Sequence, residues 1–260
     1  LANLSKEEVD LILDDKDDLN PKWSGKADHE TVRWYQAAQA KRSEGSQEIE
    51  DEISKLVHAS EHGDDSVLKQ FEGAYQPVLD GMLETLSRLG IEFDTFTKES
   101  KFVVDGTVSA LMDRLSSLEI HDSADNGAHF LDLGQRGLKG KTDFFYRRGD
   151  GSSLYATRDI AYHMWKWQQC DELINVLGED HKLQAKQVGL TLQELGERIP
   201  DVMFYAFIKL PEGKMSTRKG NVVFMDDLLE EAQAQAASVV RELRTDLSED
   251  EVAKIAEAVG

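Results

Sequence analysis

The sequence predicts a mixed α/β protein in which helices precede a small parallel sheet. Apolar residues recur every three or four positions through much of the first half, which indicates packed helices. In the second half, two short apolar runs, 173–177 and 202–210, flank a helix-length segment over 181–195 that Gly196 closes. Strand, helix and strand at this spacing form a parallel pair joined by a right-handed crossover.

The first part of the chain predicts an arm followed by helices. Residues 1–26 are acidic and carry Pro21 and Gly25, so we expect a loop or a poorly ordered arm. Apolar stripes and end signals then predict four helices: 28–42 with Asp28 as its cap, one that starts at Ser46, one from Val67 to Leu89 that ends at Gly90, and 105–118.

Turn signals mark a change of character after these helices. Asp125-Asn126-Gly127 predicts a hairpin turn, and Gly149-Asp150-Gly151 predicts a second hairpin between 144–146 and 154–156. A helix over 158–169 should follow. Asp226 is expected to cap a final helix whose buried side carries Leu228, Leu229 and Ala232.

Composition narrows the class of protein. Fifty acidic against thirty basic residues give a net charge of −20, which repels nucleic acid at ordinary ionic strength unless salt screens it. We therefore expect a source with a salty cytoplasm, a halophile, although an ordinarily acidic protein is the alternative. Cys170 is the single cysteine, which excludes an internal disulfide and fits a cytoplasmic location. No apolar run reaches the ~20 residues of a membrane span.

The most informative segment is the basic stretch Lys214–Gly220. Three cations and two hydroxyl groups are gathered there in an acidic protein, which points to a polyanion such as a triphosphate or pyrophosphate. A solvated basic turn is the alternative. This stretch and residues 178–181 each follow a predicted strand, and ligands of open parallel sheets bind beyond the carboxyl ends of strands.

Three motifs resemble one enzyme family. Lys214–Gly220 resembles the second signature loop of class I aminoacyl-tRNA synthetases, and its continuation into Val222–Asp227 is similar to arginyl-tRNA synthetases. The segment Leu154-Tyr155-Ala156-Thr157-Arg158-Asp159 resembles a motif of the same family, and Phe93-Asp94 with Glu99-Ser100 matches a weaker one. Together these motifs cover about residues 90–235.

The resemblance implies a fold and an activity. The fold would be the second half of a Rossmann-like nucleotide-binding domain with a helical insertion. Its parts would be an acidic arm and helical insertion over 1–118, the catalytic half-domain over 119–225, and a helical segment over 226–260. The activity would be ATP-dependent activation of arginine and transfer to tRNA(Arg). The implied partners are ATP with Mg²⁺ as a substrate complex, L-arginine and tRNA(Arg), with no membrane, no DNA and no metal site of the protein's own.

The resemblance also assigns roles to residues of this chain. It implies catalytic roles for Lys214, Arg218 and Lys219, ATP binding by Lys214, Met215, Ser216 and His181, and arginine binding by Tyr155, Asp159, Glu99 and His181. Thr217 stands where the family has its second lysine, so either Arg218 or Lys219 could replace that charge. Asp159 could instead favour a helix start, Tyr155 could be a half-buried strand residue, Glu99 could be a solvated acid, and His181 could satisfy backbone groups.

Other patterns remain open. His58 and His62 have helical spacing for a metal but no third ligand nearby. A second basic group could face the tRNA acceptor end or be a solvated hairpin face: Arg136, Lys139, Lys141, Arg147 and Arg148.

The chain begins at Leu1 and lacks the family's first signature, His-Ile-Gly-His, and an anticodon-binding domain. We therefore expect an inactive piece of a longer enzyme. The alternatives are another class I synthetase or nucleotidyl transferase, or a non-catalytic synthetase-like binding protein.

Overall fold

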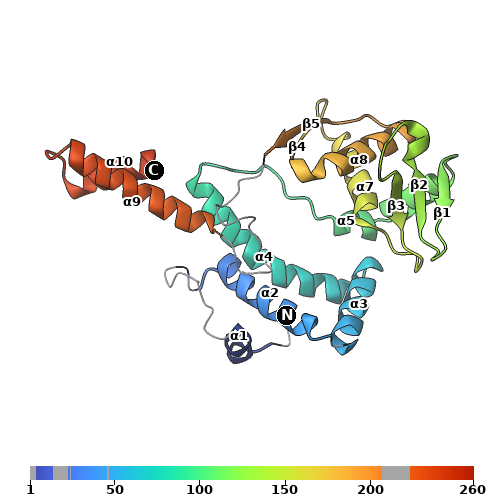
Figure 1. Cartoon of the computed structure of the whole chain (residues 1–260), viewed down its shortest axis with the longest axis horizontal. Helices are drawn as coiled ribbons and strands as arrows, with labels where there is room; N and C mark the ends of the chain where they lie inside the picture. The colour runs from blue at the N-terminus through green and yellow to red at the C-terminus, as the bar shows by residue number, and fades with distance from the viewer. Residues whose placement is uncertain (1–3, 14–22, 24, 46, 207–222) are drawn as a thin grey trace. The chain divides into compact units, whose positions relative to one another are not determined.

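The computed structural model describes residues 4–13, 23, 25–45, 47–206 and 223–260, and it divides the chain into two compact units (Figure 1). The first unit comprises Leu1–Gln47, Glu72–Asp94 and Lys209–Gly260, and the second comprises Glu48–Phe71 and Thr95–Ile208. Each unit is described by itself.

The first unit is helical. It holds α1 (Lys6–Leu13), α2 (Ala27–Ser43), most of α4 (Asp65–Arg88), α9 (Met225–Leu243) and α10 (Glu249–Val259). Helix α1 packs on α2, and α10 folds back on α9 (Figure 1). Helix α4 ends where predicted, and Gly90 after it has a φ of +67°, which glycine adopts without steric cost.

Helix α1 corrects the prediction that residues 1–26 form a loop or poorly ordered arm. Ser5 and Glu8 form a reciprocal cap: the backbone N–H of Ser5 donates to Glu8 Oε2 over 2.7 Å, and that of Glu8 donates to Ser5 Oγ over 3.2 Å. Val9 is then fully buried. The local signal for this helix, a serine followed three residues later by a glutamate, was present in the sequence.

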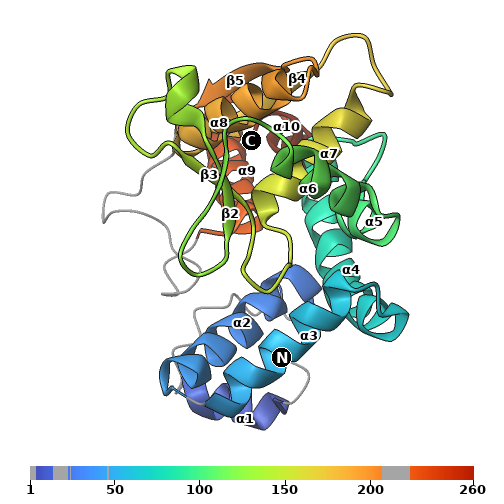
Figure 2. The same ribbon diagram turned by 90° about the vertical axis from the view of Figure 1, so that its right-hand side faces the viewer.

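The second unit is mixed α/β. In chain order it contains α3 (Gln47–Glu61, from Glu48 on), α5 (Ser100–Val104), α6 (Thr107–Ser116), β1 (His121–Ser123), β2 (His129–Asp132), the 3₁₀ turn η2 (Leu133–Arg136), β3 (Asp143–Arg147), α7 (Tyr155–Lys166), β4 (Ile174–Gly178), η3 (Glu179–His181), α8 (Lys182–Glu194) and β5 (Asp201–Tyr205). Strands β1–β2–β3 form an antiparallel sheet, and α7 lies beside β3 and α6 (Figure 2). Its core is built from side chains of both sequence halves, including Leu115, Leu131, Tyr146, Ile160 and Leu192.

The predicted parallel pair is confirmed. Strands β4 and β5 are hydrogen-bonded in parallel register from Ile174↔Asp201 to Gly178↔Tyr205, and α8 connects them. The rest of the predicted second strand, 207–210, lies outside the described residues. Residues Glu179–His181 follow the carboxyl end of β4, which is where ligands of such sheets bind.

One hairpin prediction is confirmed and the other is wrong in part. The turn at Asp125–Gly127 joins β1 to β2, with Gly127 at a φ of +77°. At Gly149–Gly151 the chain does turn, but the return strand is a single bridge between Arg147 and Ser153. Helix α7 begins at Tyr155, because Thr157 Oγ1 donates to the carbonyl oxygen of Tyr146 and so holds the first helical turn against β3. The predicted helix start at Arg158 is therefore three residues late.

Two acids predicted as helix caps have other positions. Lys26 is the N-cap of α2 and Phe224 is the N-cap of α9, so Asp28 and Asp226 lie inside the first turn of their helices. Leu228, predicted to be buried, is exposed on α9. Both carboxylates point into a shared polar cluster, because lysine, arginine and histidine side chains gather around them there.

The compact units group the chain differently from the predicted segments. Helices α9 and α10 belong with α2 and most of α4, so the segments 1–118 and 226–260 contribute to one unit. The functional division into segments remains a prediction. Among the described helices, none has the length and apolar character that a membrane span requires.

Candidate functional site

Helices α7 and α8 and strands β4 and β5 enclose the candidate site, a cavity of about 60 Å³. Its lining includes two residues predicted to bind arginine, Asp159 of α7 and His181 of η3. The structure therefore brings together residues 22 positions apart in the chain. This volume is below the ~300–1,000 Å³ that ligand pockets usually measure. The other lining residues are His163, Asn175, Leu177, Gln184, Ala185, Val188, Ile199, Pro200 and Val202.

Asp159 lines this cavity from α7. It is the fifth residue of α7, beyond the first turn, and its side chain is 31% exposed. The dipole of a helix acts mainly within the first turn. Because α7 begins at Tyr155, stabilisation of the helix start no longer explains an acid at this position.

Tyr155 and Glu99 do not line the cavity, and both contact an arginine of the chain itself. The guanidinium carbon of Arg158 lies 4.7 Å from the ring centroid of Tyr155, and its Nε lies 3.1 Å from Glu99 Oε2. Its Nη1 also lies 3.3 Å from Glu61 Oε1. Tyr155 is 70% exposed at the start of α7, so the alternative of a half-buried strand tyrosine is wrong. These two side chains hold a guanidinium, but that guanidinium belongs to Arg158.

His181 is half-exposed at the end of η3. Its Nδ1 lies 3.2 Å from Gln184 Oε1 and its Nε2 lies 3.7 Å from Asp180 Oδ1. Both ring nitrogens thus face side chains of its own turn. The ring lines the cavity that Asp159 lines, at the carboxyl end of β4.

Sequence reasoning missed His163 and Asn175, which lie beside Asp159. His163 is 4% exposed, and its Nδ1 lies 2.7 Å from the backbone oxygen and 3.2 Å from Oδ1 of Asp159. Asn175 Nδ2 lies 2.7 Å from His163 Nε2. The spacing of four between Asp159 and His163 was visible in the sequence, whereas the contact with Asn175 depends on how β4 packs against α7.

Apart from His181, the predicted ATP-binding and catalytic residues lie in the stretch that follows β5 in the chain. Lys214, Met215, Ser216, Arg218 and Lys219 all lie outside the described residues, as does Thr217. Their roles stay predictions.

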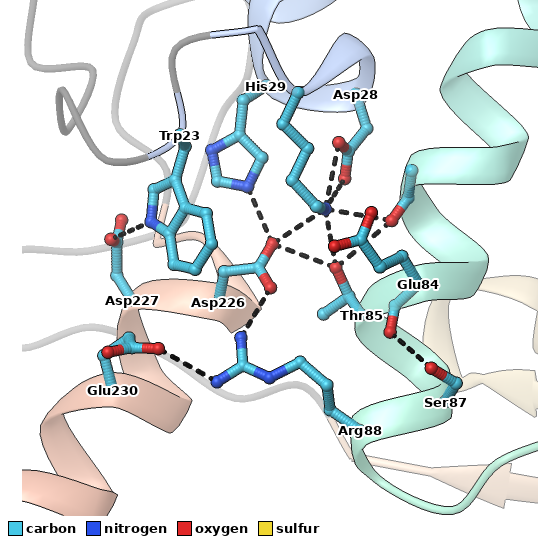
Figure 3. Close-up of polar contacts among 12 residues, drawn as sticks. Trp23, Asp28, His29, Glu84, Thr85, Ser87, Arg88, Asp226, Asp227 and Glu230 are labelled. Atoms are coloured by element: carbon cyan, nitrogen blue, oxygen red, sulfur yellow. Dashed lines mark hydrogen bonds and ion pairs between the residues drawn. The ribbon is translucent and has the colours of Figure 1, made fainter.

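A second group of polar side chains, the Asp226 cluster, lies within the first unit (Figure 3). Asp226 is 2% exposed. Its Oδ2 accepts from Lys26 Nζ at 2.9 Å, His29 Nε2 at 2.8 Å and Thr85 Oγ1 at 2.9 Å, and its Oδ1 accepts from Arg88 Nη1 at 2.9 Å. We define the cluster as Lys26, Asp28, His29, Thr85, Arg88 and Asp226.

Electrostatics favour the ionised carboxylate at Asp226. Burial by itself raises the pKa of this carboxyl, but the hydrogen bonds from Lys26, His29 and Thr85 together outweigh burial and hold the pKa at about 2. Burial likewise lowers the pKa of Lys26, and its bonds to Asp28 and Asp226 reverse that effect, so that its pKa is raised. Both partners are therefore charged at neutral pH.

Within the described residues, Asp28, His29 and Asp226 also have the spacing of a metal site. Lys26 Nζ, however, lies 2.7 Å from Asp28 Oδ2 and 2.9 Å from Asp226 Oδ2. The ammonium group thus takes the position of a cation between the two carboxylates. The cluster fits a structural ion-pair network and not a metal centre.

Two sequence patterns remain: the pair His58 and His62, and the second basic group. His58 and His62 stack with ring centroids 4.0 Å apart, and His62 Nδ1 lies 2.7 Å from the His58 carbonyl oxygen. In the second basic group, Arg136 pairs with Glu194 at 2.7 Å and Arg148 approaches Glu61 at 3.6 Å. At least these two cations are matched by acids of the same unit.

Comparison with known proteins decides the family. Residues 16–260 match the family model described as tRNA synthetases class I (R), catalytic domain. The chain belongs to the arginyl class I tRNA synthetase family. The arginine–tRNA ligase of Methanocella arvoryzae is 44% identical over 90% of this chain and 41% of its own length. That of Methanothermobacter thermautotrophicus is 40% identical over 94% of this chain and 42% of its own length.

A solved structure of this family supports the fold. The Thermus thermophilus arginyl-tRNA synthetase matches with a TM-score of 0.61 and 21% identity, over 85% of this chain and 43% of that protein. The described residues thus resemble the synthetase fold. The chain spans about two fifths of the length of the curated relatives that it matches.

Proposed function

We propose that this chain is part of the catalytic domain of an arginine–tRNA ligase. Such an enzyme activates L-arginine with ATP and transfers it to tRNA(Arg). The observation that carries the proposal is the family match over residues 16–260, which includes Asp159 and His181 on one cavity. The class I synthetase fold that the chain resembles agrees with it.

The proposal places the cavity in the second half of a Rossmann-like nucleotide-binding domain. Support comes from the parallel pair β4–β5 with α8 as its connection. In such sheets the helix following a strand begins at the ligand, where its N-terminus favours anions. His181 stands at that position, directly before α8.

Arginine would be recognised by the Asp159 carboxylate. A planar guanidinium offers two parallel N–H donors to the two oxygens of a carboxylate, and the single ammonium of lysine does not match this geometry. His181 would contact the arginine or the adenylate from η3. Tyr155 and Glu99 would join the site only if Arg158 gave up its contacts with them.

Activation is a displacement at phosphorus. A carboxylate oxygen of arginine bonds to the α-phosphorus of ATP as the bond to pyrophosphate breaks, and a ribose hydroxyl of tRNA then takes the arginyl group and releases AMP. Lys214, Ser216 and either Arg218 or Lys219 would stabilise the charge that builds on pyrophosphate, and Met215 would contact the nucleotide. Mg²⁺ would arrive with ATP and neutralise phosphate oxygens. Asp159 and His181 contribute positioning, since the chemistry asks for little covalent work by the protein.

The decisive measurement is ATP–pyrophosphate exchange by the full-length protein that carries this sequence, with each amino acid in turn and with tRNA(Arg) present. We expect exchange with arginine alone. Exchange driven by another amino acid would identify a different class I synthetase or nucleotidyl transferase. RNA binding without exchange would identify a synthetase-like binding protein. The 260-residue chain by itself should show negligible exchange.

The proposal extends to the setting of the enzyme. We propose a cytoplasmic location, supported by the single cysteine, and a salty cytoplasm, supported by the net charge of −20.

A further inference from the structure

The cavity side of α7 carries a buried histidine that the proposed reaction does not use. His163 lies one turn after Asp159, lines the same cavity and is 4% exposed. Polar side chains are rarely buried so completely without hydrogen bonds. Both ring nitrogens of His163 do have partners within the second unit.

The partners of His163 determine which nitrogen carries its proton. Lys166 Nζ, which can only donate, lies 3.0 Å from Asn175 Oδ1 and so fixes the orientation of that amide. The amide nitrogen Nδ2 then donates to His163 Nε2 over 2.7 Å. The hydrogen must therefore sit on Nδ1, which donates to the backbone oxygen of Asp159 at 2.7 Å and approaches its Oδ1 at 3.2 Å.

The hydrogen bond from Nδ1 ends on the backbone oxygen of Asp159, and the same nitrogen also lies 3.2 Å from Oδ1 of this cavity-lining residue. A contact to Oδ1 restricts rotation of the carboxylate about its own axis. Bidentate binding of a guanidinium requires that plane to be aligned with the fork of the ligand. A restricted carboxylate loses less rotational freedom when the ligand binds.

We propose that His163 is a positioning residue: held by Asn175 and Lys166, it orients the Asp159 carboxylate for the guanidinium of arginine. The inference rests on the proposed function and deepens it. His163 acts through Asp159 and does not itself touch the substrate. Burial also lowers the pKa of Lys166.

Two substitutions separate the two sides of the ring. The amide nitrogen of asparagine is the same number of bonds from Cα as Nδ1 of histidine. His163→Asn therefore keeps a donor toward Asp159. The amide oxygen and nitrogen of glutamine are the same number of bonds from Cα as Nε2 of histidine. His163→Gln therefore keeps only the contact with Asn175. In the full-length enzyme we expect His163→Gln to raise the KM for arginine about tenfold, with the KM for ATP within about twofold of wild type. His163→Asn should restore the KM for arginine to within about threefold of wild type.

A double-mutant cycle tests whether the effect passes through Asp159. If it does, adding His163→Gln to Asp159→Asn raises the KM for arginine less than about twofold further. Equal effects of the Asn and Gln variants, multiplying effects in the double variant, or a matching rise in the KM for ATP would each overturn the inference. Thermal unfolding of every variant separates lost stability from lost positioning.

A readout without catalysis keeps the two proposals apart. Nitrogen NMR of the His163 ring in the 260-residue chain should show the proton on Nδ1. A proton on Nε2 refutes the hydrogen bonds that link Lys166, Asn175 and His163. If wild-type enzyme shows no arginine-dependent exchange, the proposed function fails, and this inference fails with it. If wild type and Asp159→Asn behave as proposed and His163→Gln equals wild type, only the inference fails.

Discussion

At the scale of single residues, the Asp226 carboxylate is buried and closely surrounded by donors. It accepts four hydrogen bonds from residues of two separate segments, and three of the donors carry or can carry positive charge. The sequence showed only an acid near a helix start, for which capping was the simpler prediction. The cluster was not predictable because Lys26 and Asp226 are 200 positions apart.

Removing the charge at Asp226 should destabilise the first unit. Asp226→Asn removes one of the two carboxylates that pair with Lys26 and one of the two that pair with Arg88, and it places a neutral amide among buried cations. We expect the free energy of unfolding to fall by about 3 kcal/mol. Urea denaturation measures this. Asp246→Asn is the matched control: that carboxylate also pairs with an arginine, at 2.8 Å, but both side chains are exposed and solvent screens the pair. A loss at Asp226 no larger than the loss at Asp246 would contradict the assignment.

The same carboxylate should make stability depend on acid. Its pKa is about 2 in the folded protein and near the ordinary 3.8 when unfolded. The unfolded state therefore binds the proton more tightly, and the stabilisation is fully present above about pH 4 and is lost as the pH falls through 2. Unfolding midpoints from pH 5 to pH 2 should fall less steeply for Asp226→Asn than for wild type. Parallel curves would count against this pKa.

At the scale of elements, the helices that kept a regular apolar stripe or a clear stop signal were predictable. Helix α4 and the end of α8 follow from periodicity and glycine, which act locally. The start of α7 was not predictable, because a bond from Thr157 to the Tyr146 carbonyl on a neighbouring strand sets it. That difference of three residues matters for function, since it removes the helix-start explanation for Asp159.

Helix α10 offers a test of local encoding. Ser248 Oγ accepts from the backbone N–H of Glu251, and Glu251 reaches back to the backbone N–H of Ser248. Ser248→Ala should cost about 1 kcal/mol of stability and increase amide exchange along α10. Ser116→Ala in α6 is the control, because that serine only donates to a carbonyl three residues earlier and alanine favours a helix. Equal effects of the two substitutions would show that the cap contributes nothing.

At the scale of the whole molecule, charge is the dominant property. The chain has fifty acidic and thirty basic residues. At low salt, repulsion among the excess negative charges destabilises compact states. Ion pairs relieve it only locally, as between Arg136 and Glu194.

Salt should therefore stabilise the protein. We expect the melting temperature to rise as KCl is increased from millimolar to molar concentrations, because screening weakens repulsion between acids. Sucrose is the control, since it stabilises through exclusion from the surface and does not screen charge. A melting temperature that falls with KCl while it rises with sucrose would contradict adaptation to a salty cytoplasm.

The sequence by itself determined the α/β class, the parallel pair and most helices, because periodicity and turn chemistry are local, and its short motifs made Asp159 and His181 candidates for the site. Only the tertiary structure decided that these two residues line one cavity, that Arg158 contacts Tyr155 and Glu99, and that His163 is held by Asn175. It alone also assembled the Asp226 cluster. The physical reason is that such contacts join distant segments, and their hydrogen bonds form only once packing has excluded water from between them.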